Sequence, residues 1–309
     1  IDLGTAGCPV SSTQDVTITP SPTLDLGVDV AICQGDSTLL DAGSGHTNYL
    51  WNTGETTQTI YVDTAGTYNV TVGNGTSANN TNSLSFDGVD DYISITQNSL
   101  SYNAFSISID FKSDEDDKVG RLISNGSNNE IVLMLANNPN PLGSLRFIVG
   151  NPEIDIYVPN IHNGSWHNIT GTFDESYMKL YVDGIIKDSI LNTNQVQISN
   201  NFFVSCRDNF SEFFKGNLDN FQFWNKALTQ TEIQQYIYSP PTGNEAGLVG
   251  YWNFNEGSGS TVTDLSGNGN NGTINGATWS TDAPAQYANN CTATDDIVAV
   301  SYTHLTLPT

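Results

Sequence analysis

Residues 164–189 read GSWHNITGTFDESYMKLYVDGIIKDS, and this stretch indicates the fold class. Apolar Met178, Leu180 and Val182 alternate with other side chains, which is the two-residue period of a strand with one buried face. The Asp-Gly pair that begins at Asp183 can adopt the positive φ angles of a tight hairpin turn. Similar short runs, bounded by Gly, Asn and Asp clusters, recur along the chain. The sequence therefore predicts an all-β protein built as a sandwich or jelly roll.

The composition excludes several functional classes. The 309 residues include 9 Lys and Arg against 33 Asp and Glu, a formal net charge of −24, with only 14% of residues charged. Nine basic residues are too few to form a nucleic-acid-binding stripe or to bind an anionic membrane surface. Disorder is excluded because 37% apolar and 10% aromatic residues provide enough burial to offset the entropy of ordering. The length favours two domains, and no apolar run approaches the roughly 18 residues of a membrane span.

Both ends of the chain indicate a fragment. The sequence begins at Ile1 without a signal peptide, and its last residues, 301–309, read SYTHLTLPT, unlike everything before them. We therefore expect a piece of a longer protein, and we exclude residues 301–309 from the fold as a non-native tail.

One helix is predicted among the strands. In LTQTEIQQYI, Thr229 and Glu232 have the spacing of a capping box, and Leu228 can pack onto Ile233 as a hydrophobic staple. A short helix should therefore begin at Thr229, the alternative being a chance Thr-x-x-Glu in a loop.

Residues 24–76 form a block rich in Thr, Gly and Asp. Its motifs are Cys33-x-Gly35-Asp36, Tyr49-x-Trp51-x-x-Gly54 and Gly66-Thr67-Tyr68. The block resembles the Ig-like or polycystic-kidney-disease-like modules of large bacterial surface proteins. In that family a last strand follows a Gly-Cys or Asn-Cys turn, and here such a strand appears only at 290–300. The resemblance implies a module split into 24–76 and 285–300 by an inserted domain, with residues 1–23 as the last strand of a preceding module and a linker.

The insert, residues 82–283, resembles a second family. Three ordered motifs carry the resemblance: SLSFDGVDDYISI at 83–95, the stretch at 164–189, and FFKGNLDNFQFWNKALTQTEIQQY at 213–236. They are similar to laminin-G-like, concanavalin A-like jelly rolls related to the pentraxins. The resemblance implies a jelly-roll sandwich inserted into an Ig-like β-sandwich.

The order of segments in the insert departs from that family. Gly247–Trp279 normally precedes the first motif but comes last here, which implies a circular permutation. The new ends, near Asn82 and Asp282, should then lie close together, as insertion into a hairpin requires. The alternative is that a second, truncated jelly roll begins at Gly247.

Four cysteines without Cys-x-x-Cys spacing argue against zinc or redox chemistry. The Ig-like resemblance implies a disulfide between Cys33 and Cys291, across the insert, with the usual stabilisation of ~2–4 kcal/mol. Cys8 would pair upstream of this fragment, and Cys206 is predicted to be a buried thiol.

Oxygen-rich turns suit Ca²⁺, which binds carboxylate and carbonyl oxygens in flexible geometry. Asp87, Asp90 and Asp91 surround a Gly turn. The jelly-roll resemblance implies calcium at the rim of the sandwich, held by these residues and Asp219, with Asp264 as a reserve ligand. The alternative is that these aspartates are solvated turn formers.

The same resemblance implies carbohydrate binding. Arg146 should point away from the buried face of its strand, where it is the candidate ligand-binding residue; simple solvation is the alternative. The related glycosidases use a Glu-x-Asp-x-(x)-Glu strand. Glu153-Ile154-Asp155 lacks the third carboxylate, the acid that protonates the leaving oxygen.

We therefore predict a non-catalytic, calcium-stabilised adhesion fragment of a secreted or cell-surface bacterial protein. Its partners would be an extracellular glycan or surface polysaccharide and neighbouring Ig-like modules of the same chain, without nucleic acid or membrane insertion. A purely structural stalk is the first alternative, and a glycoside hydrolase is the second.

Overall fold

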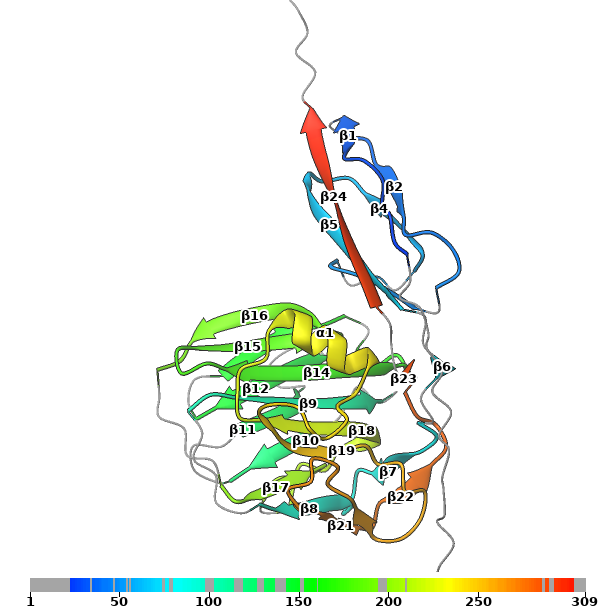
Figure 1. The fold of residues 1–309 in the computed structure, drawn as a ribbon. Coiled ribbons are helices and arrows are strands. Elements are labelled where there is room, and N and C mark those ends of the chain that lie inside the picture. The colour runs from blue at the N-terminus through cyan, green and yellow to red at the C-terminus, as the bar shows by residue number, and fades with distance from the viewer. Residues whose placement is uncertain are drawn as a thin grey trace, which may run out of the picture.

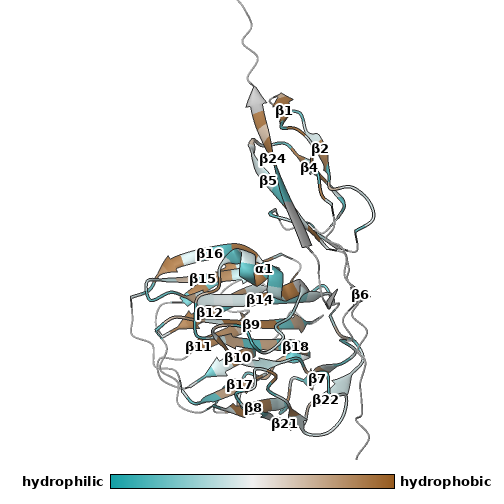
Figure 2. Ribbon diagram, in the orientation of Figure 1, coloured by the Kyte–Doolittle hydropathy of each residue, from teal (hydrophilic) through white to brown (hydrophobic). Residues whose placement is uncertain are grey.

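The computed structural model describes residues 23–33, 35–46, 48–53, 55, 57–73, 76–77, 80–97, 103–113, 119–126, 131–136, 143–150, 153–159, 161–193, 199–208, 210–284, 287–288 and 292–302. As predicted, the regular structure in these ranges is almost entirely strand (Figure 1). The strands enclose separate hydrophobic cores, and they carry most of the hydrophobic colour in Figure 2. The described chain therefore forms a small and a large domain.

The small domain takes its strands from distant parts of the sequence. They are β1 (Val30–Cys33), β2 (Thr38–Asp41), β3 (Asn48–Trp51), β4 (Thr59–Val62), β5 (Gly66–Gly73) and β24 (Thr292–Tyr302). One sheet has the order β1–β24–β5–β3, and the other pairs β2 with β4. Trp51, Val70 and Val72 are fully buried between them. The chain thus returns in β24 to complete a sheet that it left after β5.

The last strand is longer than predicted. Ser301 and Tyr302 belong to β24 and pair with Ile32 and Cys33 of β1. Their exclusion from the fold as part of a tail is therefore wrong, because β1 offers backbone partners at these two positions. Residues 303–309 lie outside the described residues.

The described residues do not bear out the predicted disulfide at Cys33. β1 runs parallel to β24, so Cys33 pairs with Tyr302 at one end of β24, while Thr292 pairs with Gly73 at the other. An 11-residue strand spans about 35 Å, whereas the Cα atoms of a disulfide lie within about 7 Å. Cys33 is an exposed free thiol, and Cys291 and Cys8 lie outside the described residues.

The large domain is a sandwich of two sheets. The back sheet has the order β16 (Ile185–Leu191), β15 (Tyr177–Val182), β14 (Trp166–Phe173), β9 (Phe105–Lys112), β18 (Lys215–Trp224), β7 (Ser83–Asp87) and β22 (Thr278–Ser280), with β19 (Leu248–Trp252) also paired to β18. The front sheet has the order β13 (Glu153–Tyr157), β12 (Ser144–Val149), β11 (Ile131–Ala136), β10 (Gly120–Asn125), β17 (Asn201–Val204), β8 (Tyr92–Thr96), β21 (Gly272–Asn275) and β20 (Thr261–Val262). A continuous core of Ile, Leu, Val and Phe lies between the sheets.

The predicted hairpin connects β15 to β16. Asp183 and Gly184 have φ angles of 50° and 75°, as the Asp-Gly sequence requires. Met178 and Leu180 are fully buried in the core, which confirms the alternation. A side chain at Gly184 would come within 2.7 Å of Gln234 Cγ, so the glycine also permits close approach of the helix.

The predicted helix is confirmed as α1 (Gln230–Tyr238). Thr229 is its N-cap, and both hydrogen bonds of the capping box with Glu232 are present. Leu228 and Ile233 lie in one buried cluster with Trp224 of the back sheet. The staple therefore fixes α1 on the outer face of that sheet (Figure 1).

Residues 248–280 complete both sheets of the same sandwich. β19 pairs with β18, β21 with β8, and β22 with β7. A second jelly roll beginning at Gly247 is therefore excluded. Ser83 Oγ donates to the backbone oxygen of Asp282 at 2.7 Å, which confirms that the two ends of the domain are adjacent. The connections to the small domain also pair, as β6 (Thr76–Ser77) with β23 (Tyr287–Ala288).

Candidate functional site

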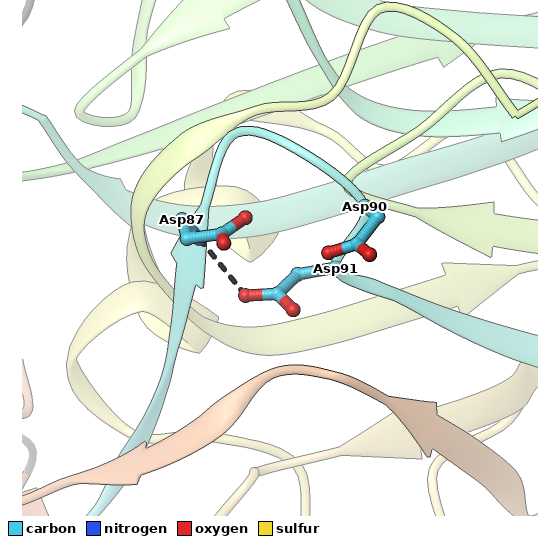
Figure 3. A group of neighbouring side chains, drawn as sticks. All are labelled: Asp87, Asp90 and Asp91. Carbon is cyan, nitrogen blue, oxygen red and sulfur yellow. Dashed lines mark hydrogen bonds between the residues drawn. The ribbon is translucent and has the colours of Figure 1, made fainter.

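The turn from β7 to β8 brings three of the predicted calcium ligands together (Figure 3). One oxygen from each of Asp87, Asp90 and Asp91 lies within 4.8 Å of the others. Gly88, with a φ of 77°, makes the reversal that gathers them. Calcium binds oxygens at about 2.3–2.6 Å, so one ion could contact all three carboxylates.

Asp91 is the buried member of this acidic trio, whereas Asp87 and Asp90 are exposed. Its Oδ2 accepts the backbone N–H of Asp87 at 2.9 Å, and Asp87 Oδ1 accepts the N–H of Val89 at 2.8 Å. Desolvation, and after it the charges of Asp87 and Asp90, raises the pKa of Asp91. A cation would relieve this repulsion. The same two hydrogen bonds would stabilise the turn without a metal ion, as expected if these aspartates are solvated turn formers.

Asp219 lies apart from the trio. Lys215, at the start of β18, pairs with Asp87, and Asp219 follows four residues later, about 13 Å along the strand. Asp219 is fully buried, and its two oxygens accept hydrogen bonds from Asn80 Nδ2 and the N–H of Asn220, both at 2.8 Å. It therefore does not complete the predicted calcium site.

Asp219 belongs instead to a buried carboxylate pair that sequence reasoning missed. Asp110 of β9 lies directly opposite it and accepts hydrogen bonds from the side-chain amides of Asn168 and Asn220, both at 2.7 Å. Desolvation raises the pKa of Asp110 to about 6 and that of Asp219 well above its usual range. Alternation on β9 predicts only that Asp110 points away from the core. No local signal shows that this outer face is covered.

Asp264 organises its own loop. Its oxygens accept hydrogen bonds from the N–H groups of Tyr251, Ser266 and Asn270, and from the side chains of Ser266 and Asn270, at 2.6–3.2 Å. Five donors from the chain already surround this buried carboxylate, which makes it a turn former and not a reserve member of the acidic trio.

Arg146 lies on the outer face of the front sheet, as alternation predicts. Its Nε donates to Asp155 Oδ2 at 2.7 Å, and the two side chains are 19% and 16% exposed. Asp155 Oδ1 is buried without a hydrogen-bond partner in the described part of the chain. The candidate ligand-binding arginine is thus part of an ion pair, and the second oxygen of its partner is buried and out of reach of a ligand.

The side chains of β13 do not support the glycosidase alternative. Glu153 is exposed, Asp155 is engaged by Arg146, and the strand has no third carboxylate. Cys206 is buried as predicted, and burial raises the pKa of its thiol to about 12, which makes it a poor nucleophile.

Comparison with known proteins matches most of the large domain to one family model. Residues 87–234 match the family model of the concanavalin A-like lectin/glucanases superfamily. The large domain is therefore a concanavalin A-like, laminin-G-type jelly roll. No curated protein matches the chain.

Solved structures resemble this chain at low sequence identity. One is a Bacteroides ovatus ATCC 8483 protein to which carbohydrate binding has been provisionally ascribed, 13% identical with a TM-score of 0.57, covering 86% of this chain and 99% of that one. Others are a heptameric SAP-like pentraxin of Limulus polyphemus (15%, 0.45, covering 63% and 94%) and the sialyllactose-bound CBM40 of a Ruminococcus gnavus sialidase (16%, 0.37, covering 43% and 82%). At 13% identity the similarity to the Bacteroides ovatus protein concerns the fold alone. No helix in the described ranges is long and apolar enough to cross a membrane.

Proposed function

We propose that the chain is a non-catalytic carbohydrate-binding fragment of a secreted or cell-surface bacterial protein, stabilised by calcium. The observation that supports it most is the lectin-type sandwich with an acidic trio in the turn between its two sheets. The similar Bacteroides ovatus fold is consistent with this role.

Calcium would act on the fold through the β7–β8 turn. β7 belongs to the back sheet and β8 to the front sheet, so an ion on Asp87, Asp90 and Asp91 would fix a connection between them. Because the unfolded chain does not hold the three carboxylates together, bound calcium should raise the Tm of the large domain. D90N should abolish this rise, whereas D63N, at an exposed position of the small domain, should keep it. An unchanged Tm at millimolar calcium would remove the metal from the proposal.

The small domain would serve as an Ig-like module that carries the lectin domain within a longer protein. Its two sheets, β1–β24–β5–β3 and β2–β4, support this proposal, as does the pairing of β6 with β23 where the chain enters and leaves the insert. Neighbouring modules of the same type would then precede it.

Glycan binding separates the proposal from the stalk alternative. The intact chain is applied to a glycan array with calcium and again with a chelator. A calcium-dependent signal on a defined group of glycans is expected for a lectin. Absence of binding under both conditions would favour a structural spacer.

A further inference from the structure

Three aromatic rings meet on the outer side of the front sheet, close to the acidic trio. The ring centroids of Tyr92 and Phe210 are 5.1 Å apart, those of Phe203 and Phe210 are 5.9 Å apart, and those of Tyr92 and Phe203 are 6.4 Å apart. Phe210 is 53% exposed, and Tyr92 and Phe203 are partly exposed. We call these three residues the ring platform.

Strand alternation places two of these rings on the outer surface. Ile93 of β8 and Phe202 and Val204 of β17 face the core, so their neighbours Tyr92 and Phe203 face outward. The connection from β17 to β18 supplies Phe210. It runs beside the β7–β8 turn, because β17 pairs with β8 and β18 pairs with β7. Both connections cross from one sheet to the other at the same rim.

Phe210 is held in an unfavourable backbone conformation. Its φ is 57°, and Ser205 and Glu212 in the same connection also have positive φ values, of 76° and 56°. Hydrogen bonds between Phe210 N and Arg207 O, and between Arg207 N and Ser211 O, both 2.9 Å, maintain the loop. A phenylalanine that is half exposed in a left-handed conformation contributes little to folding, since it gains little burial and loses backbone freedom.

We propose that the ring platform presents Phe210 to the apolar face of a pyranose unit of a neutral glycan, with Tyr92 and Phe203 supporting that ring. One face of many pyranoses presents C–H groups while the hydroxyls project from the edge, so such a sugar needs a small aromatic surface with a polar border. The platform offers both: the half-exposed ring of Phe210, which Tyr92 and Phe203 contact at interplanar angles of 55° and 84°, and a polar border of Asn275 opposite Tyr92 and Ser94 opposite Phe203.

Charge selects the kind of glycan. The chain carries a net charge of −24, and Asp87, Asp90 and Asp91 at the same rim outweigh the charge of one calcium ion, so the rim stays negative when the metal is bound. A uronate polymer would be repelled, whereas an uncharged polysaccharide would not. This inference rests on the proposed carbohydrate binding and specifies its contact residues and ligand class.

Phe210→Gly tests the platform without removing the fold. Glycine accepts a φ of 57° without a steric penalty, so the variant loses the ring and relieves the backbone strain at the same position. Y92A removes a second ring. Y177A is the matched control, because Tyr177 is 46% exposed but lies on the back sheet.

The intact protein and the three variants are compared by affinity electrophoresis in native gels containing xyloglucan, galactomannan, arabinoxylan or alginate. We expect retardation of the wild type by a neutral polysaccharide, at least tenfold weaker binding of F210G and Y92A, unchanged binding of Y177A, and a Tm of F210G close to that of the wild type. A wild type retarded by no gel overturns the proposed function and this inference with it. Equal retardation of a folded F210G and the wild type, or binding to alginate alone, overturns the ring platform and leaves carbohydrate binding in place.

Discussion

The two domains follow the same alternating pattern of strand residues but close their structures differently. The large domain brings its own ends together at Ser83 and Asp282, and residues 83–282 supply every strand of its two described sheets. The small domain leaves β5 and needs β24, more than two hundred residues later, to complete its four-stranded sheet. The difference shows which domain can fold independently: the inserted domain is complete in sequence, and its host is not.

The largest expected effect comes from separating the domains. Residues 80–284 should fold alone, with sharp near-UV circular dichroism and a cooperative transition. Residues 23–77 should not, because without β24 they lose Ile297 and Ala299 from the core and expose the edges of β1 and β5. Joining residues 23–73 to 292–302 through an Asn-Gly turn should restore folding. Cooperative unfolding of residues 23–77 by themselves would show that the small domain does not need β24 in order to fold.

A second test compares one buried tryptophan from each domain. Trp51 of the small domain and Trp252 of the large one are both fully buried, and each donates its indole N–H to a backbone oxygen, of Thr57 and Asn270 respectively. Each Trp→Ala substitution should cost about 3–5 kcal/mol of unfolding free energy. In differential scanning calorimetry of the whole chain, W51A should lower only the small-domain transition and W252A only that of the large domain. If either substitution lowered both transitions equally, the two domains would unfold as one unit.

A smaller effect should appear as pH dependence, and only in the large domain. The pKa of Asp110 is about 6 in the fold, above its ordinary value of 3.8, so the folded state binds this proton more tightly than the unfolded chain does. The resulting stabilisation, of order 2–3 kcal/mol, is present below pH 4 and is lost as the pH rises through 6. D110N should remove this component from urea unfolding curves between pH 4 and 7. E175Q, at an exposed position, should retain it, and a D110N profile parallel to wild type would exclude Asp110 as its source.

Local signals predicted local structure well. The Asp183-Gly184 turn, the capping box at Thr229 and the gathering of Asp87, Asp90 and Asp91 depend on residues close in sequence, whose geometry the turn or helix start determines. The adjacency of the domain ends was also predictable, since insertion into a hairpin requires it.

Features that depend on long-range pairing could not be predicted. Alternation does not distinguish parallel from antiparallel pairing, and the parallel register of β1 and β24 separates Cys33 from the Thr292 end. Alternation also places Asp110 and Arg146 outside the core without showing what lies beside them. In the structure Asp110 is buried opposite Asp219, and Arg146 is paired with Asp155.

The central claim is that the inserted domain alone carries the carbohydrate-binding function. The most direct test measures by isothermal titration calorimetry the binding of the polysaccharide that retards the intact chain, using residues 80–284 and the whole protein side by side in calcium. The account predicts the same affinity for both, with F210G weakened equally in each. Binding by the whole protein but not by a folded 80–284 fragment would contradict it, because the binding site would then require the small domain.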